Sequence, residues 1–426
     1  MFSKTSEIYD VIIIGAGQAG LSAGYFLNKH GLSYVIFERG SIGESWLNQR
    51  WDSLRLDTPA WMNCLPGDLP EVGKRDQFIP SQDFHAGLTK YVENNRIPVK
   101  EHYRVTALDK DDSTGFFNVE TDHNGEMEIW LAKKVIVASG MLNEPKTPSI
   151  SKTLPANITQ LHSFHYKNPD QLPAGNVLIV GSAKSGAQIA EEIAATAHKV
   201  YLATSKVGRL PRRYRGADIT DWFVRSGNFE LRTDELADPS IALNDVPFLV
   251  SGDGPLGHTL SLQGLYRDGV TLLGSLLRWE EGKLYFDDST KANIQFGDQI
   301  SAKIKQRVDE YIQKNGIAAS PADVDDADLP DPEGLSVTTD TQLDIAEHGI
   351  TTVIWATGLR GNFGWLKLPV FDQQSKLVHE EGVSPIRGLF FLGFPWLRTR
   401  KSGTIYGLQD DAAYITDQLA AQLSID

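Results

Sequence analysis

The sequence predicts an α/β protein of two domains, each built around a parallel sheet. A strand, a glycine turn and a helix follow one another at 10–38, and the same order returns at 177–204. A unit of this kind holds the pyrophosphate of a dinucleotide at the N-terminus of its helix. Apolar strands at 135–140 and 351–358 would close the two sheets where the chain crosses between domains. We therefore expect two Rossmann-like dinucleotide-binding domains, the second inserted into a discontinuous first one.

The composition is typical of a globular protein and narrows its partners. With 426 residues, of which 41% are hydrophobic, the chain is long enough for two packed cores. Its net charge of −14 would repel a phosphate backbone, so we expect no nucleic-acid partner. The apolar runs fall short of the roughly 20 residues that span a bilayer, and the N-terminus lacks a signal-peptide core. We expect a cytoplasmic protein without membrane contact or a metal cluster, and its oligomeric state stays open.

The first unit matches a dinucleotide-binding turn at every position. A short apolar strand turns through Gly15, Gly17 and Gly20 into a helix of about three turns, which ends at Gly31. The next strand delivers Glu38, 18 positions after Gly20, where its carboxylate can accept hydrogen bonds from a ribose diol. Because this unit opens the chain and flavin-type elements follow it, we expect it to bind FAD.

The second unit departs from the pattern at one position. Its turn comprises Gly181, Ser182, Ala183, Ser185 and Gly186, with alanine in place of the middle glycine. A methyl group there should push the phosphates outward, while the helix N-terminus still attracts an anion. We expect a working site with looser binding of the coenzyme; the alternative is a structural relic.

The end of the following strand predicts the coenzyme of the second site. Thr204 stands where an acid would bind the ribose of NADH, and Ser205, Lys206 and Arg209 follow it. A carboxylate would repel a 2′-phosphate, whereas cations and hydroxyls can bind one. NADPH is therefore expected, with Ser205, Lys206 and Arg209 around its 2′-phosphate. The alternative reading of these cations is a solvated loop.

The late strands set the expected domain boundaries. The FAD domain would comprise 1–165 and 341–426, and the NADPH domain would comprise 166–340 with an insertion that shapes the substrate pocket. In the last segment, Gly403 and Thr404 would begin a long helix whose N–H groups face the flavin pyrimidine. The alternative is a plain C-terminal packing helix.

The insertion carries a few recognisable elements but no motif that identifies a substrate. The sequence predicts a hairpin within 269–286, a helix over 297–316 and a surface linker rich in proline and aspartate at 320–334. Aromatic residues at 217–229 would line a substrate entrance or belong to the domain core.

With both glycine turns in this order, the chain resembles the single-component flavin-containing monooxygenases, in particular their bacterial relatives. Beyond the turns, three stretches are similar to that family: "SIGESWLNQRWDSLRLDTP" with Gly43 and Trp46, "WATG" with Thr357 and Gly358, and "HSFHYK" at 162–167. Family members of the Baeyer–Villiger type would carry Trp at position 166, so the Tyr present there implies oxygenation of nitrogen or sulfur. The leading Phe-x-Gly of the linker signature is absent, since "ANI" occupies 156–158.

The resemblance implies that NADPH reduces FAD and that the reduced flavin traps O₂ as a C4a-hydroperoxide, which oxygenates a soft centre of a small molecule. Three residues are candidates for the catalytic site: Trp46 covering the flavin, and Arg50 and Asp57 facing the cleft. Trp46 would otherwise be core, and Arg50 and Asp57 would otherwise be surface ion-pair members. Asp57 stands where relatives often have an Asn; its charge would destabilise an anionic peroxyflavin and favour peroxide leakage.

Two rival functions remain open at the level of sequence. One is an NADPH oxidase or acceptor reductase without oxygen transfer, and the other is a flavin-binding sensor without turnover. Because Cys64 is the only cysteine, the chain itself can form no redox-active dithiol, which leaves O₂ as the simplest electron acceptor.

Overall fold

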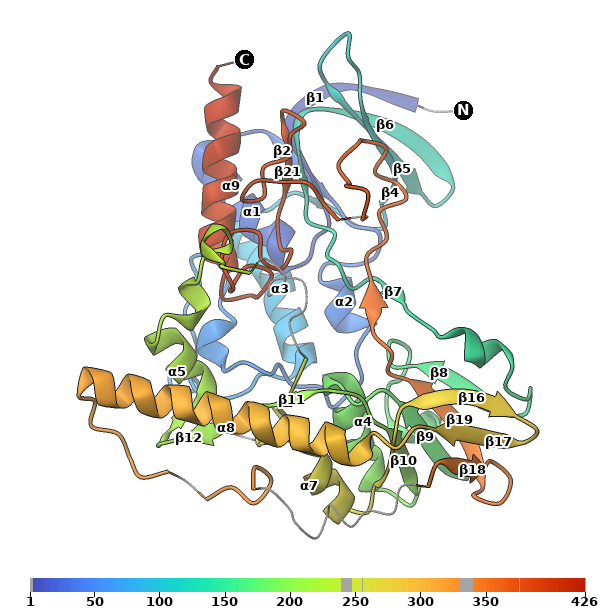
Figure 1. Cartoon of the computed structure of the whole chain (residues 1–426). Helices are drawn as coiled ribbons and strands as arrows, with labels where there is room; N and C mark the ends of the chain where they lie inside the picture. The colour runs from blue at the N-terminus through green and yellow to red at the C-terminus, as the bar shows by residue number, and fades with distance from the viewer. Residues whose placement is uncertain are drawn as a thin grey trace.

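The computed structural model describes residues 3–238, 247–254, 256–322, 324–329, 340–374 and 376–425. The chain forms two lobes, one above the other in Figure 1, each with its own sheet. The first and last parts of the chain form the upper lobe, and the middle part forms the lower lobe. Within the described ranges, none of the helices is long and apolar enough to span a lipid bilayer.

The upper sheet is centred on β1 (Ser3–Ile14), which pairs in parallel with β2 (Tyr34–Phe37) and β6 (Glu126–Val137). The strand β3 (Val99–Lys100) extends it beyond β2, and β21 (Leu389–Phe391) pairs with the end of β6. An antiparallel meander of β4 (Arg104–Lys110) and β5 (Phe117–His123) continues from β6. The helices of this lobe are α1 (Gln18–His30), α2 (Glu44–Leu47), α3 (Ser81–Asn95) and α9 (Leu408–Leu423).

The lower sheet has five parallel strands in the order β15, β10, β9, β19, β8. Their bounds are β8 (Thr159–His162), β9 (Asn176–Val180), β10 (Val200–Ala203), β15 (Thr271–Leu273) and β19 (Ile350–Trp355). Its helices are α4 (Lys184–Ala194), α5 (Ile219–Arg225), α7 (Leu262–Arg267) and α8 (Thr290–Asn315).

Short strands and 3₁₀ turns complete the structure. The small antiparallel sheet beside the lower lobe comprises β16 (Leu276–Glu280), β17 (Lys283–Phe286) and β18 (Gln342–Asp344). The short pairs are β11 (Gly208–Arg209) with β14 (Phe248–Leu249), and β12 (Arg213–Tyr214) with β13 (Ala217–Asp218). The 3₁₀ turns are Ala60–Met62, Ser149–Lys152, Pro169–Gln171, Asn228–Glu230 and Thr233–Glu235.

The central strands are buried because helices or strands cover both faces of each sheet. Val11, Ile12 and Ile13 are fully buried, and their side chains divide between two separate core clusters. A run of consecutive apolar residues is what a parallel strand covered on both faces requires. The mixed α/β fold with two parallel-strand sheets that the sequence predicts is confirmed.

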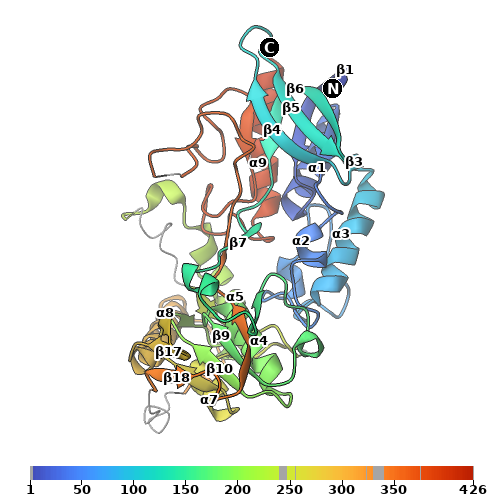
Figure 2. The same ribbon diagram turned by 90° about the vertical axis from the view of Figure 1, so that its right-hand side faces the viewer.

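Two segments of the chain pair where they pass between the lobes. There β7 (Glu144–Pro145) pairs antiparallel with β20 (Leu359–Arg360). Figure 2 shows β7 between the two lobes. The strands β8 and β19 both belong to the lower sheet, although the expected boundaries at 165 and 340 assign them to the FAD domain. We therefore propose boundaries near the β7–β20 pair instead.

The insertion combines expected and unexpected elements. The hairpin forms from β16 and β17, while the preceding strand β15 joins the large sheet. The predicted helix is α8, which begins at Thr290 and ends before Gly316 at a left-handed C-cap. The loop at 320–334 is not wholly a surface linker, because Asp328 is buried. Residues 323 and 330–334 of that loop lie outside the described ranges.

Candidate active site

The first glycine turn has the backbone geometry that close packing requires. Gly15 adopts φ +107°, and a Cβ atom there would lie 2.6 Å from the carbonyl oxygen of Ala138. A Cβ atom on Gly20 would lie 1.9 Å from the carbonyl oxygen of Gly15. Around Gly17, in contrast, a Cβ atom would meet no atom within 4 Å. The first and third glycines are therefore fixed by the backbone, whereas the middle one faces open space at the N-terminus of α1.

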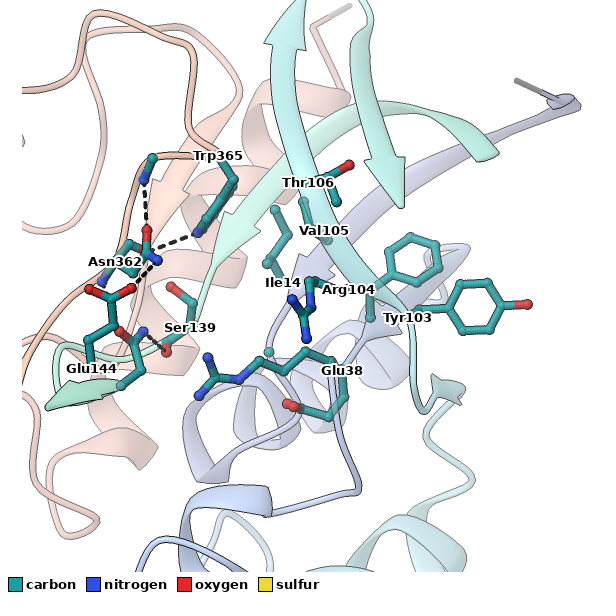
Figure 3. A pocket seen from close by; sticks show the side chains of 15 residues that line it. Ile14, Glu38, Tyr103, Arg104, Val105, Thr106, Ser139, Glu144, Asn362 and Trp365 are labelled. Atoms are coloured by element: carbon teal, nitrogen blue, oxygen red, sulfur yellow. Dashed lines mark hydrogen bonds between the residues drawn. The ribbon is translucent and has the colours of Figure 1, made fainter. Parts of the chain in front are cut away.

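Glu38 follows β2 and is buried, with 8% of its surface exposed. Its Oε2 accepts a hydrogen bond from the N–H of Ala16 at 2.9 Å, and its Oε1 accepts one from the N–H of Gly40 at 3.0 Å. Burial nevertheless raises the pKa of this carboxyl group above its usual value. Figure 3 shows Glu38 beside Arg104 at the floor of a cavity of about 590 Å³, which we call the end cavity.

Two further cavities continue from the end cavity. The neck, of about 210 Å³, shares Gly15, Glu38 and Ser139 with it. The interdomain cavity, of about 490 Å³, shares Trp46 and Arg50, among others, with the neck. The three cavities therefore form one continuous path from the end of β2 past the first glycine turn to the space between the lobes.

Polar groups with one protein partner or none line this path. Among the described residues, Ser139 Oγ and Gln49 Oε1 are buried and have no hydrogen-bond partner. The Arg50 guanidinium donates to the carbonyl oxygen of Gln49 at 2.8 Å, and burial lowers its pKa. A long ligand with hydroxyl and phosphate groups would satisfy all three. Together with the open space at Gly17, these groups fit FAD.

Trp46 lies where the resemblance predicts, along the neck and the interdomain cavity. Its helix α2 begins after Gly43, which adopts φ +66°. The Trp46 indole N–H donates to Gln18 Oε1 at 3.0 Å, its ring packs edge-on against Phe84, and the Arg50 guanidinium lies 5.5 Å from its ring centre. The ring is therefore held in a fixed orientation at the cavity wall.

The C-terminal segment meets the cavity differently from the prediction. Gly403 and Thr404 do line the interdomain cavity, but α9 begins only at Leu408, after Gly407. Gly403 adopts φ +82°, and the Thr404 hydroxyl donates to the carbonyl oxygen of Lys401 at 2.6 Å. These residues form a tight turn, because the chain must leave β21 and reverse before it becomes helical. The prediction of a helix N-terminus at Gly403 is wrong.

Thr357 and Gly358 line none of the three cavities. The Thr357 hydroxyl donates to the carbonyl oxygen of Lys146 at 2.5 Å, and the Gly358 carbonyl oxygen lies 3.1 Å from His162 Nε2. Both residues instead join the two chain segments that cross between the lobes. We do not propose them as cofactor ligands.

The second glycine turn repeats the backbone of the first. A Cβ atom on Gly181 would lie 2.5 Å from the carbonyl oxygen of Ala356, and one on Gly186 would lie 1.8 Å from that of Gly181. Ala183 adopts φ −70° and ψ 179°, close to the φ −77° and ψ −178° of Gly17. Its methyl group therefore causes no backbone strain, and this partly buried side chain packs against a core cluster of the lower lobe.

The proposed 2′-phosphate ligands separate into two groups. Ser205 donates its N–H to Ser182 Oγ at 2.9 Å, and Lys206 is exposed. Arg209 is buried and forms ion pairs with Asp328 at 2.8 Å and Asp298 at 2.5 Å. Because two carboxylates already neutralise its charge inside the protein, Arg209 is not available to a phosphate. That part of the prediction is wrong.

Asp57 spans the interface between the lobes. Its Oδ2 lies 2.8 Å from Lys184 Nζ, and its Oδ1 accepts a hydrogen bond from Gln188 Nε2 at 3.0 Å. Both partners are on α4, directly after the second glycine turn. Asp57, Lys184, Ser185 and Gln188 all line the interdomain cavity. Residues that follow both turns, Gln18 in the first and Lys184 in the second, thus line one cavity. Asp57 lies beside the second turn.

Sequence reasoning missed several lining residues. Gln18 and Gln49 contribute amide groups, and Phe229 and Tyr406 contribute aromatic rings 5.9 Å apart. Of the aromatic residues at 217–229, Phe229 reaches the cavity, whereas Trp222 is buried in a core cluster. No local signal marks these residues, because they come together only from four distant segments.

Comparison with known proteins assigns the chain to a family. Residues 12–216 match the pyridine nucleotide-disulphide oxidoreductase family. The chain is 31% identical over 414 residues to the oxidoreductase CzcO of Bacillus subtilis, which covers 97% of this chain and 99% of that protein. The chain belongs to the same oxidoreductase family as this CzcO protein. The enzyme class predicted from the sequence, an oxidoreductase that depends on FAD and NADP, is confirmed.

Two further proteins that are similar to this chain are named monooxygenases. The chain is 32% identical over 215 residues to the probable indole-3-pyruvate monooxygenase YUCCA1 of Arabidopsis thaliana, and the match covers 49% of this chain and 50% of that protein. The structure of a flavin-containing monooxygenase from Stenotrophomonas maltophilia aligns with a TM-score of 0.63 at 23% identity, over 98% of this chain and 99% of that one. The resemblance to flavin-containing monooxygenases is confirmed.

Proposed function

We propose that this oxidoreductase is an NADPH-dependent flavin monooxygenase that oxygenates a soft nitrogen or sulfur centre of a small molecule. One observation carries the proposal: the interdomain cavity is lined by Trp46 and Gly403 from the flavin side and by Lys184 and Ser185 from the second turn. Hydride transfer requires the two ring systems to stack, and only a shared cavity allows that.

The residues of the first lobe would hold and orient FAD. The N-terminus of α1 at Gly17 would bind the pyrophosphate, with Arg50 as a counter-charge, and Glu38 would accept hydrogen bonds from the ribose. Trp46, fixed by Gln18, would flank the ring system. When bound, FAD supplies the chemistry that takes a hydride from NADPH and activates O₂.

The residues of the second lobe would hold NADPH. The N-terminus of α4, with Lys184 and Ser185, would bind its pyrophosphate, and Ser205 and Lys206 would bind its 2′-phosphate. Ala183 stands at the middle position of the turn, where its methyl group would weaken the contact with the pyrophosphate.

Two features support O₂ as the electron acceptor. Cys64 is the only cysteine, so the chain itself offers no dithiol. Burial raises the pKa of its thiol, and Cys64 lines a cavity beside α3 that adjoins the interdomain cavity without Cys64 belonging to the lining of the latter. Both features favour oxygen transfer over thiol reduction.

Part of the lining of the interdomain cavity suits an uncharged, apolar group. Leu56, Met62, Phe229 and Tyr406 line it, and Asn63 is held by its own loop through bonds to Thr58 and Pro59. Oxygenation of a nitrogen or sulfur lone pair needs little acid–base assistance, which agrees with this lining.

Rapid mixing tests the proposed function. Protein loaded with FAD is reduced by NADPH without oxygen, mixed with oxygen, and followed by absorbance. We expect a transient species that differs from oxidised and reduced flavin and decays faster when an amine or thioether is present. Direct reoxidation with stoichiometric peroxide would instead indicate an oxidase, and a flavin that NADPH does not reduce would indicate a protein without turnover.

A further inference from the structure

The carboxylate of Asp57 is held by two side chains at the beginning of α4. Lys184 and Gln188, one helical turn apart, each hold one of its carboxylate oxygens, at 2.8 Å and 3.0 Å. The Asp57 side chain comes from the loop that follows α2 of the other lobe and is 22% exposed. An acidic group from one domain therefore lies at the helix N-terminus of the other.

The position of Lys184 makes this arrangement informative. A cation in the first turn of a helix is disfavoured by the helix dipole, so an anion is needed beside it. The same first turn, directly after Ala183, is where the pyrophosphate of a dinucleotide binds. Asp57 thus supplies negative charge at the place where the coenzyme would bring its own.

The other charged neighbour of Asp57 does not change this balance. Arg212 donates to the main-chain oxygen of Asp57 at 2.8 Å, and its guanidinium forms an ion pair with Asp218 at 2.6 Å. Arg212 therefore fixes the loop while its charge is already neutralised. Lys184, which is 47% exposed, is the cation that can exchange one anion for another.

We propose that Asp57 is an internal competitor of the coenzyme: it neutralises Lys184 in the free protein, and the pyrophosphate of NADPH displaces it from Lys184. Asp57 is then a positioning residue of the second turn and not a catalytic residue at the flavin. The inference rests on the proposed function, since it places NADPH at this turn. Its consequence is that coenzyme binding breaks a charged contact between the two domains.

Calorimetric titration of NADP⁺ into the FAD-loaded protein tests the proposal. Removal of the competing charge in Asp57→Asn should tighten NADP⁺ binding about fivefold, the size of one partly exposed ion pair. Asp57→Glu, which keeps the charge, should bind as the wild type does. Asp52→Asn is the matched control, because Asp52 lies in the same loop and bonds across the interface to Asn168 without contacting Lys184. It should leave the affinity unchanged.

Two further arms separate competition from a purely structural role. In a Lys184→Gln background, Asp57→Asn should have no effect on NADP⁺ affinity. Adenosine 2′-phosphate, which lacks the pyrophosphate, should bind Asp57→Asn and wild type equally. A thermal melt of each variant shows whether it is folded.

The possible outcomes distinguish a failure of the proposed competition from a failure of the proposed function. Weaker or equal NADP⁺ binding by folded Asp57→Asn would overturn the competition, as would an equal gain for adenosine 2′-phosphate. If the wild type and all variants failed to bind NADP⁺, the proposed function itself would be overturned.

Discussion

The two dinucleotide turns share a backbone but present different chemistry to the interdomain cavity. In both, the first and third glycines are fixed by backbone carbonyl oxygens, which a Cβ atom at these positions would approach to 1.8–2.6 Å. The middle residue has nearly the same φ and ψ in both, yet it is Gly17 in one turn and Ala183 in the other. The comparison teaches that backbone packing requires glycine at the first and third positions, whereas the backbone of the middle position accepts either glycine or alanine.

The residue after the middle position also differs. Gln18 follows Gly17 and orients Trp46, whereas Lys184 follows Ala183 and pairs with Asp57. The second turn therefore combines a methyl group that keeps a phosphate away with a cation that attracts it. This combination predicts a coenzyme that binds and leaves readily, beside a flavin that stays bound.

The largest expected effect concerns the third glycine of the first turn. Gly20→Ala places a Cβ atom 1.9 Å from the carbonyl oxygen of Gly15. Because the clash is with a backbone atom, it cannot be relieved by rotation of a side chain. We expect a loss of about 4 kcal/mol or more of unfolding free energy and no retained flavin. Denaturant titration measures the unfolding free energy, and the absorbance of the purified protein measures the retained flavin.

The matched control for this variant is Gly17→Ala, which recreates the middle residue of the second turn. With no atom within 4 Å of the new methyl group, the unfolding free energy should change by less than about 0.5 kcal/mol, while FAD binding weakens. An equally large loss of stability in both variants would break the comparison.

The second prediction compares two cations of the lower lobe, the buried Arg209 and the exposed Lys206. Arg209→Met removes the cation paired with Asp298 and one of the two cations paired with Asp328, the other being Lys305, and should cost about 3 kcal/mol of unfolding free energy. The preference for NADPH over NADH should persist in the protein that remains folded. Lys206→Ala should instead keep the stability and lower that preference, as judged from the two dissociation constants.

The third prediction concerns a buried acid of the upper lobe. Desolvation raises the pKa of Asp411 to about 6, and the nearest Arg398 nitrogen is 3.8 Å from its carboxylate. Because the folded state then binds more protons than the unfolded state, stability should fall as the pH rises from about 4 through 6. Asp411→Asn should remove this fall and raise the unfolding free energy at pH 7 by about 3 kcal/mol. Denaturant titrations at several pH values check the slope, and an unchanged slope would contradict the assignment.

The smallest expected effect tests the middle position of the second turn. Ala183→Gly removes the methyl group without altering φ or ψ, so NADPH binding should tighten about threefold to tenfold, as for removal of one poor contact of about 1 kcal/mol. Fluorescence titration with NADPH measures the change. Equal or weaker binding by the glycine variant would show that the methyl group is no handicap.

Local elements follow well from the sequence, and assembled sites follow less well. The helix that ends at Gly31 and the strand that delivers Glu38 lie where the pattern predicts, because both depend on neighbours in the chain. The prediction for Arg209 is wrong since Asp298 and Asp328, which neutralise it, are far away in sequence. The helix expected at Gly403 in fact begins at Leu408, because small and polar residues are equally typical of turns.

By itself, the sequence determined the two glycine turns, their cofactors and the enzyme class, because a turn that binds a dinucleotide needs fixed residue types at fixed spacing. Only the tertiary structure decided which cation is free, which acid faces which helix and which rings line the cavity. Those properties depend on distances between segments such as the loop at Asp57 and the first turn of α4, and no local pattern encodes them. Burial and pairing of charge are set by the folded neighbourhood and not by the residue type.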